Sequence, residues 1–153
     1  MAYLVATVIG ISVLSACGSA DRDSSGEVIE EGYVSAWEIK VGDCLTDTFD
    51  SASSTEFSSA NAVPCDQPHV FEAYHSEDIT GDTFPTDLDT IADDICYYAF
   101  VDFVGISVEQ TYLTYSSLQP TQESWEGKFD REITCVVSMI DSSDITGTLR
   151  NSG

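Results

Sequence analysis

The sequence predicts an α+β domain, in which a small, mainly antiparallel sheet packs on one main helix and two disulfides fasten the fold. One segment has the apolar spacing of a long helix, and several short segments alternate like strands. Helices and strands do not alternate regularly along the chain, which argues against a parallel α/β sheet. The length of 153 residues and the hydrophobic fraction of 42% are typical of one compact domain.

The start of the chain is typical of an export signal. Residues 1–16 contain no charged side chain, are mostly apolar and are shorter than the roughly 20 residues that cross a bilayer as a helix. The run from Leu14 to Cys17 looks like the lipobox of bacterial lipoproteins, in which the cysteine is lipidated after cleavage. We therefore expect a lipoprotein signal peptide at 1–16 and a lipid on Cys17 that holds the protein on the extracellular face of the cell membrane. A buried N-terminal helix is the alternative.

Small, polar and acidic residues with little apolar periodicity follow at 17–33. We expect this segment, which starts with the lipidated cysteine, to be a flexible acidic tether between the membrane and a folded domain at 34–150. The whole chain has 27 Asp and Glu against 5 Lys and Arg, a net charge of −22. Nucleic acid is excluded as a partner, because phosphate binding needs clustered Lys and Arg.

Several short segments of the expected domain have the composition or the alternation of strands. In the second of them, a period of two places His69 and His75 on one face and Glu72 on the other. The absence of regular βαβ units makes these strands mainly antiparallel partners of one sheet. In chain order, the expected strands lie at 34–40, 69–79, 110–116 and 132–140.

The main helix is expected at about residues 86–104. Its apolar residues recur at helical spacing, Pro85 precedes the pattern and Gly105 follows it, which are typical helix boundaries. The apolar stripe contains Cys96, so this cysteine should face the core. The stripe consists of Leu88, Ile91, Ala92, Ile95, Cys96, Ala99 and Phe103.

The cysteines after Cys17 form an even set in a chain that we expect to be exported, which is the condition for a disulfide framework. Sequence alone allows three connectivities for such a set. Cys96 on the core face of the helix and Cys135 on the core face of the last strand make Cys96–Cys135 a plausible bridge, which leaves Cys44–Cys65. A metal site is the alternative, but no C-x-x-C pair occurs in the chain.

Several motifs follow one another between about residue 37 and residue 150. They are Val41-Gly42-Asp43-Cys44, Val63-Pro64-Cys65, Pro68-His69 with Glu72, Cys96, Pro120, Trp125, Gly127, Asp130-Arg131, Cys135 and Thr146-Gly147-Thr148-Leu149-Arg150. Their order and spacing resemble the septum formation domain family, a group of exported or membrane-anchored proteins of high-GC Gram-positive bacteria. The resemblance implies an envelope location and a link to cell division, and it implies no established catalytic activity.

The residues that could carry chemistry are few. The hydrolase motifs G-x-S-x-G, S-x-x-K and H-E-x-x-H do not occur. His69 and His75 could ligate a metal with Glu72 or Asp66, although the alternation places Glu72 on the other face. The favoured interpretation is that His69 closes the turn after Pro68 by bonding to backbone and that His75 lies at a sheet surface. We expect neither a metal nor another cofactor.

Trp125 and Arg131 are the other candidates for contact with a ligand or partner, besides His69 and Glu72. Trp125 is expected to cap the core beside the helix-to-strand disulfide, with a sugar or peptide contact as the alternative. Arg131 shares the parity of the inward residues of the last strand, so it should lean inward against Asp130, Asp43 or another carboxylate. A ligand-anchoring arginine is the alternative for this residue.

These features predict a lipid-anchored envelope protein with a noncatalytic binding or adaptor domain, associated with the cell wall or septum formation. The expected partner is an envelope or division protein. One alternative is a hydrolase acting on cell-wall material, with His69 and nearby carboxylates as its site. Another is a ligand-capture lipoprotein with an aromatic pocket around Trp125.

Overall fold

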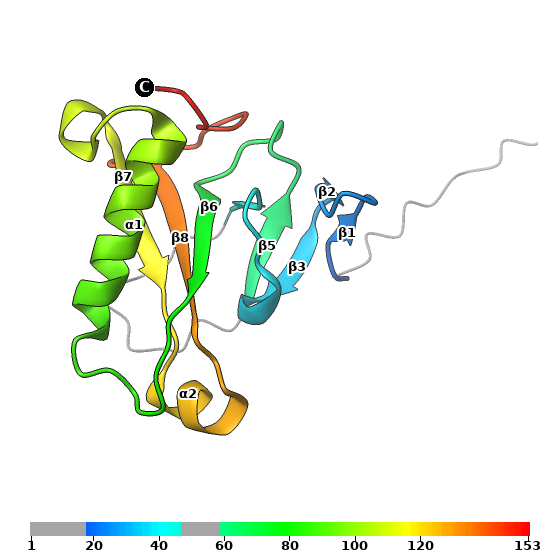
Figure 1. The fold of residues 1–153 in the computed structure, drawn as a ribbon. Coiled ribbons are helices and arrows are strands. Elements are labelled where there is room, and N and C mark those ends of the chain that lie inside the picture. The colour runs from blue at the N-terminus through cyan, green and yellow to red at the C-terminus, as the bar shows by residue number, and fades with distance from the viewer. Residues whose placement is uncertain (1–17, 47–58) are drawn as a thin grey trace, which may run out of the picture.

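The computed structural model describes residues 18–46 and 59–153, and its centre is a sheet with the strand order β3-β5-β4-β6-β8-β7 (Figure 1). Neighbouring strands in this sheet are antiparallel. Together with the helices, this arrangement confirms the α+β class. The strands are β3 (Gly32–Ser35), β4 (Cys44–Leu45), β5 (Ser59–Val63), β6 (Phe71–Asp78), β7 (Leu113–Leu118) and β8 (Glu132–Met139).

The main helix, α1 (Leu88–Val104), lies across one face of the half-sheet made by β6, β8 and β7 (Figure 1). It confirms the expected helix. It ends at Gly105, whose φ of 98° lies in the left-handed region and whose N–H donates to the Val101 carbonyl at 2.9 Å. The apolar stripe of α1 packs on the sheet and forms the first core. This core contains Tyr74, Leu88, Ala92, Cys96, Phe100, Phe103, Val104, Leu113, Ile133, Cys135 and Val137.

A β-bulge in β6 decides which of its side chains face α1. Glu72 pairs with Val137 of β8, whereas His75 pairs with Cys135, so Tyr74 is an extra residue between them. Val137 and Cys135 both belong to the core beneath α1, and directly paired residues share a face. Glu72 and His75 therefore both face α1. The expected alternation, which put them on opposite faces, is wrong because the bulge shifts the strand by one residue.

Both expected disulfides are present. Cys96 joins α1 to Cys135 of β8, with a Cα–Cα distance of 5.4 Å, and Cys44 joins β4 to Cys65 with a Cα–Cα distance of 5.3 Å. Each pair has the Cα spacing that a disulfide requires. The first bridge fastens the helix to the sheet, and the second fastens β4 to the turn that leads into β6.

A second core covers the other face of the sheet and extends over its β3–β5–β4 half. It is built mostly from aliphatic side chains, with Phe71 as its aromatic member. Its members are Val28, Val34, Ile39, Leu45, Ala60, Ala62, Val70, Phe71, Ala73 and Val136.

The described residues before β3 belong to the fold, which corrects the expectation of a flexible tether at 17–33. β1 (Asp21–Arg22) and β2 (Val28–Glu30) form an antiparallel pair beside the main sheet (Figure 1). Both terminal nitrogens of Arg22 donate to the Asp43 carboxylate, at 2.6 and 2.7 Å, and this bond raises the pKa of Arg22. The pairing spans 21 residues, so no local pattern in the acidic segment predicts it.

Two local elements also differ from expectation. The first expected strand, at 34–40, is only the short β3, because the chain turns at Ala36–Glu38 into a single 3-10 turn. A short helix, α2 (Gln122–Lys128), connects β7 to β8; the Thr121 side chain caps it by accepting the Ser124 N–H at 3.0 Å. Figure 1 shows α2 at the end of the sheet opposite to the chain's C-terminus.

Candidate functional site

The four residues expected to contact a ligand or partner do not meet in one site. His69 lies just before β6 and Glu72 near its start, whereas Trp125 lies in α2 and Arg131 directly before β8, at the opposite end of the sheet (Figure 1). Each pair is held inside the fold by its own contacts. Those contacts determine what chemistry remains available to a ligand.

His69 is completely buried and bonded to the backbone. Its Nδ1 lies 2.8 Å from the Gln67 carbonyl, so Nδ1 carries the proton and donates it. The His69 backbone also exchanges two hydrogen bonds with Ile145, at 3.0 and 2.8 Å. Its Nε2 has no hydrogen-bond partner within the part of the chain that the structure describes. The structure thus places His69 as a turn-closing residue whose ring is covered, as the favoured interpretation expected.

Glu72 holds the C-terminal segment, residues 145–150, against the sheet. The residue is only 3% exposed; one carboxylate oxygen accepts the Thr148 hydroxyl at 2.6 Å and the other accepts the Leu149 N–H at 2.7 Å. These bonds satisfy a buried charge that would otherwise be costly. Thr148 and Leu149 belong to the last sequence motif, and Glu72 to an earlier one, so the fold joins the two motifs directly.

Trp125 is buried beneath Arg131. The Trp125 ring is 1% exposed and has Phe84 edge-on against it, with ring centroids 5.8 Å apart. The Arg131 guanidinium lies 3.5 Å from the ring centroid and donates to the backbone carbonyls of Trp125 and Asp130 at 2.9 and 2.8 Å. The expected ion pair of Arg131 is therefore corrected, because aromatic stacking and backbone carbonyls take the place of a carboxylate.

The carboxylates that were expected for Arg131 are bound elsewhere. Asp130 accepts the Ser124 hydroxyl at 2.8 Å, and Asp43 pairs with Arg22. Trp125 and Arg131 consequently form a closed structural unit at the α2 end, and the Trp125 ring does not present an open aromatic surface.

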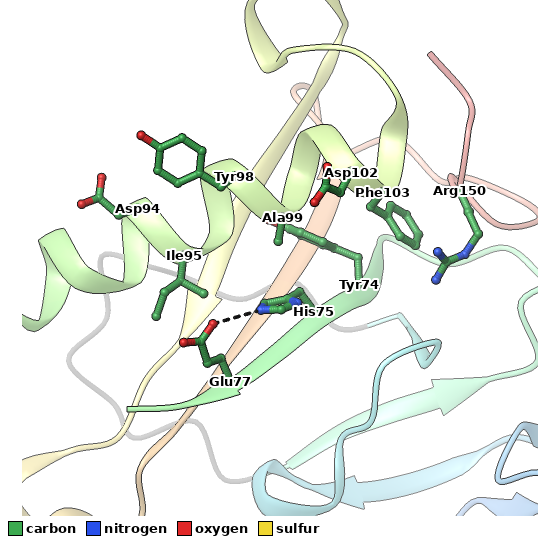
Figure 2. A pocket seen from close by; sticks show the side chains of 10 residues that line it. All are labelled: Tyr74, His75, Glu77, Asp94, Ile95, Tyr98, Ala99, Asp102, Phe103 and Arg150. Carbon is green, nitrogen blue, oxygen red and sulfur yellow. Dashed lines mark ion pairs between the residues drawn. The ribbon is translucent and has the colours of Figure 1, made fainter. Parts of the chain in front are cut away.

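One open feature on this side of the sheet is a groove between α1 and β6, with a volume of about 490 Å³. We call it the α1–β6 groove, and Figure 2 shows its side chains. It lies over the part of β6 that follows the bulge. The residues that line it are Tyr74, His75, Glu77, Asp94, Ile95, Tyr98, Ala99, Asp102, Phe103 and Arg150.

The helix wall of the groove is formed by side chains that recur at helical spacing. Asp94, Tyr98 and Asp102 recur every four residues, so they form one stripe along α1. Tyr98 is 70% exposed, although its edge touches Tyr97 at a centroid distance of 5.6 Å. This stripe was visible in the sequence as two carboxylates around an aromatic residue at helical spacing. The sequence did not reveal it as a candidate site, because no local pattern shows that β6 lies opposite this stripe.

The strand wall carries His75 and Glu77, whose side chains are 36% and 56% exposed and form an ion pair at 3.5 Å when the histidine is protonated (Figure 2). At the floor, the Tyr74 hydroxyl donates to the Cys96 carbonyl at 2.6 Å, and burial raises the pKa of Tyr74 far above its ordinary value. The β6 bulge brings both features to the helix side, since Tyr74 is the extra residue and His75 follows it.

The groove has an acidic end and a basic end. Figure 2 shows Asp94 and Glu77 toward one end and Arg150 at the other, where its guanidinium lies 4.6 Å from the Phe103 ring centroid. Within the described ranges, Asp94, Asp102 and Arg150 form no ion pair within 4.0 Å. The groove therefore offers unpaired charges beside an exposed aromatic ring.

A second cavity, of about 540 Å³, lies near the β1–β2 turn and shares Arg150 with the groove. Two of its acidic side chains, Asp43 and Glu72, are already bound to Arg22 and to the C-terminal segment. Those two side chains are engaged by the fold, whereas the α1–β6 groove presents an exposed tyrosine with Asp94 and Asp102, which form no ion pair among the described residues. The α1–β6 groove is therefore the better candidate site.

In residues 18–46 and 59–153, no group of three or more His, Cys, Asp or Glu could hold a metal ion. No helix within them is both long and apolar enough to cross a membrane. Cys17 and the segment 1–16 lie outside the described residues, so the expected signal peptide and lipid anchor remain predictions.

The fold and the groove define a small disulfide-bonded α+β domain with an open acidic-aromatic surface. The family described as Septum formation matches residues 41–153, and the chain belongs to this family. Searches of the curated proteins and of the solved structures found no match. Family membership points to a role related to cell division or the envelope, and it assigns no residue a function.

Proposed function

We propose that the protein is a noncatalytic adaptor of the cell envelope, which binds a division or cell-wall protein through the α1–β6 groove. The observation that carries this proposal is the contrast in availability. His69 and Glu72 are covered and engaged by the chain itself, whereas the groove presents an exposed tyrosine and unpaired carboxylates. Exposed aromatic and charged side chains in a concave surface are what a partner protein would contact.

The two alternatives have less support from the geometry. A hydrolase that uses His69 as its base would need the imidazole to reach substrate, and the ring is 0% exposed. A ligand-capture protein that uses Trp125 would need an open indole face, and this ring is 1% exposed beneath Arg131. Binding in the groove requires neither residue to move.

We further propose that a lipid on Cys17 anchors the protein. Gly18, the next residue, already accepts the Tyr33 N–H at 3.0 Å, so the folded part begins directly after the proposed anchor. On this proposal the lipid would hold the β1–β2–β3 edge close to the membrane. Two acyl chains are sufficient for stable anchoring.

The anchor is tested by fractionation of cells that express the full chain. The Cys17→Ser variant should leave the membrane fraction, whereas the wild type and a Ser19→Ala control should stay in it. Unchanged membrane retention of Cys17→Ser would show that the protein is held in another way.

The adaptor role is tested by chemical crosslinking of the full-length protein in intact cells, followed by identification of the linked proteins. Recovery of a division or cell-wall protein is expected. The competing hydrolase function is tested by incubating the purified protein with cell-wall material. If the wild type hydrolyses this material and a folded His69→Asn variant does not, the adaptor proposal is wrong and the hydrolase alternative is supported. Asn keeps an N–H donor near the Gln67 carbonyl, so this variant is less disruptive than alanine.

A further inference from the structure

We propose that the α1–β6 groove binds a basic segment of its partner protein, in which a Lys or Arg side chain lies against Tyr98 and between the carboxylates of α1 and β6. This inference rests on the proposed adaptor function and adds the chemistry of the partner. Such binding needs a groove, a charge that selects the occupant, and a surface that accepts the aliphatic part of the Lys or Arg side chain.

The charge of the groove selects a cation. Its lining includes the carboxylates of Glu77, Asp94 and Asp102, against one arginine, Arg150. The carboxylates come from both walls, so a cation in the groove would meet negative charge from two sides. Such complementarity steers a partner and sets its register. The net charge of −22 makes an anionic surface, such as nucleic acid or acidic lipid, an unfavourable occupant.

Tyr98 supplies the third requirement, the surface for the aliphatic part of the side chain. Its ring is 70% exposed, and the partly buried Ile95 and Ala99 lie beside it on the same wall. A Lys or Arg side chain can lay its methylene groups on apolar surface while its charge interacts with the ring face and the carboxylates.

The chain itself uses this kind of contact at three other places. Arg131 lies 3.5 Å from the centroid of Trp125, Arg150 lies 4.6 Å from that of Phe103, and Lys128 lies 4.7 Å from that of Trp37. In each case a cation of this chain covers an aromatic ring. No cation of the described residues lies over Tyr98 in this way, so the partner would supply it.

Arg150 gives the binding a direction. It lies at the end of the groove opposite to Asp94 and Glu77 (Figure 2). A basic side chain would be repelled by Arg150 and attracted by the two carboxylates. The partner's Lys or Arg should therefore lie at the Asp94 end.

Binding is measured with a fluorescent peptide that alternates Arg and Leu and with a control peptide that has Glu in place of Arg. The purified wild-type chain should bind the basic peptide and not the acidic one. The double variant Glu77→Gln/Asp94→Asn should weaken binding by about tenfold or more, because it removes charge from both walls. Tyr98→Ala should weaken it by about threefold to tenfold.

The matched control is Asp89→Asn/Glu126→Gln, which changes the net charge equally at residues outside the groove. It should change the affinity by less than about twofold, since exposed distant charges are screened by salt. Equal weakening by both double variants would show that the peptide responds only to the overall acidity, and the groove proposal would be wrong. Unfolding curves of all variants establish that each is folded.

A crosslink in cells separates this inference from the proposed function. A photoreactive amino acid in place of Tyr98 should link to a partner peptide that contains Lys or Arg. If the crosslinked peptide is acidic, the basic-segment inference fails while the adaptor function stands. If neither this residue nor the chemical crosslinker yields any partner, the adaptor function itself fails.

Discussion

Two regions of the molecule each contain a histidine and a glutamate, but in opposite environments. His69, just before β6, and Glu72, near its start, are buried and bonded to residues of the 145–150 segment, whereas His75 and Glu77, beyond the bulge, line the open groove. The residue types are the same in both regions. Coverage by another chain segment, more than residue identity, therefore decides whether such side chains stabilise the fold or are accessible to a partner.

Each region also has its own disulfide. Cys44–Cys65 lies at the closed end, where the Cys65 carbonyl accepts the Gly147 N–H at 2.6 Å. Cys96–Cys135 fastens α1, the helix wall of the groove, to β8. The two bridges therefore allow either region to be disturbed separately.

The largest effect is expected from removal of the groove disulfide. The double variant Cys96→Ala/Cys135→Ala should lower the free energy of unfolding by about 4 kcal/mol, because the bridge closes a long loop of the unfolded chain. Cys44→Ala/Cys65→Ala should cost about 3 kcal/mol, since its sequence separation is 21 rather than 39 residues. Urea unfolding measures both losses.

The same two variants test whether each disulfide supports only one of the two regions. Only the Cys96/Cys135 variant should weaken peptide binding in the groove, since it frees the helix wall. A loss of binding from the Cys44/Cys65 variant alone would contradict the assignment of one bridge to each region.

A smaller effect separates the two glutamates. Glu72→Gln should lower the free energy of unfolding by about 2 kcal/mol, because it replaces a charged acceptor of two buried hydrogen bonds. Glu77→Gln is the matched control, and it should stay within about 0.5 kcal/mol of the wild type because its side chain is exposed. Hydrogen exchange at the Leu149 amide should accelerate only in Glu72→Gln. Similar losses for both variants would remove the distinction between the closed end and the groove.

The smallest effect concerns alkaline pH. Burial raises the pKa of Tyr74, and burial with the Asp93 hydrogen bond raises the pKa of Tyr115 to about 12. Unfolded tyrosines ionise near pH 10, so both groups contribute stability that is fully present below that pH and is lost as the pH rises further. For Tyr74 the loss is about 1.4 kcal/mol per pH unit above 10.

Urea unfolding between pH 9 and 11 measures this slope. Tyr74→Phe should be less stable than the wild type at pH 9, because it lacks the bond to the Cys96 carbonyl, but its stability should fall less steeply with pH. An unchanged slope in Tyr74→Phe would mean that the floor of the groove admits the ionised phenol.

Much of the scaffold was predictable because its signals are local. The apolar stripe before Gly105 predicted α1, and alternation around Cys135 predicted β8. The same patterns placed Cys96 and Cys135 in one core, which made their disulfide the plausible pairing. The bond that fastens β1 to the domain was missed because Arg22 reaches a partner, Asp43, far along the chain.

Sequence by itself determined the fold class, the main helix and the acidity, and it favoured the disulfide pairing that the structure has. Periodicity and cysteine position are properties of short segments, and acidity is a property of the whole composition. Tertiary structure alone decided which acidic residues are available. The bulge at Tyr74 arises from the pairing of β6 with β8, and it turns His75 toward α1. Residues 145–150 cover Glu72 from more than 70 positions away. Burial and register depend on what packs against a residue, and that is set by contacts distant in the chain.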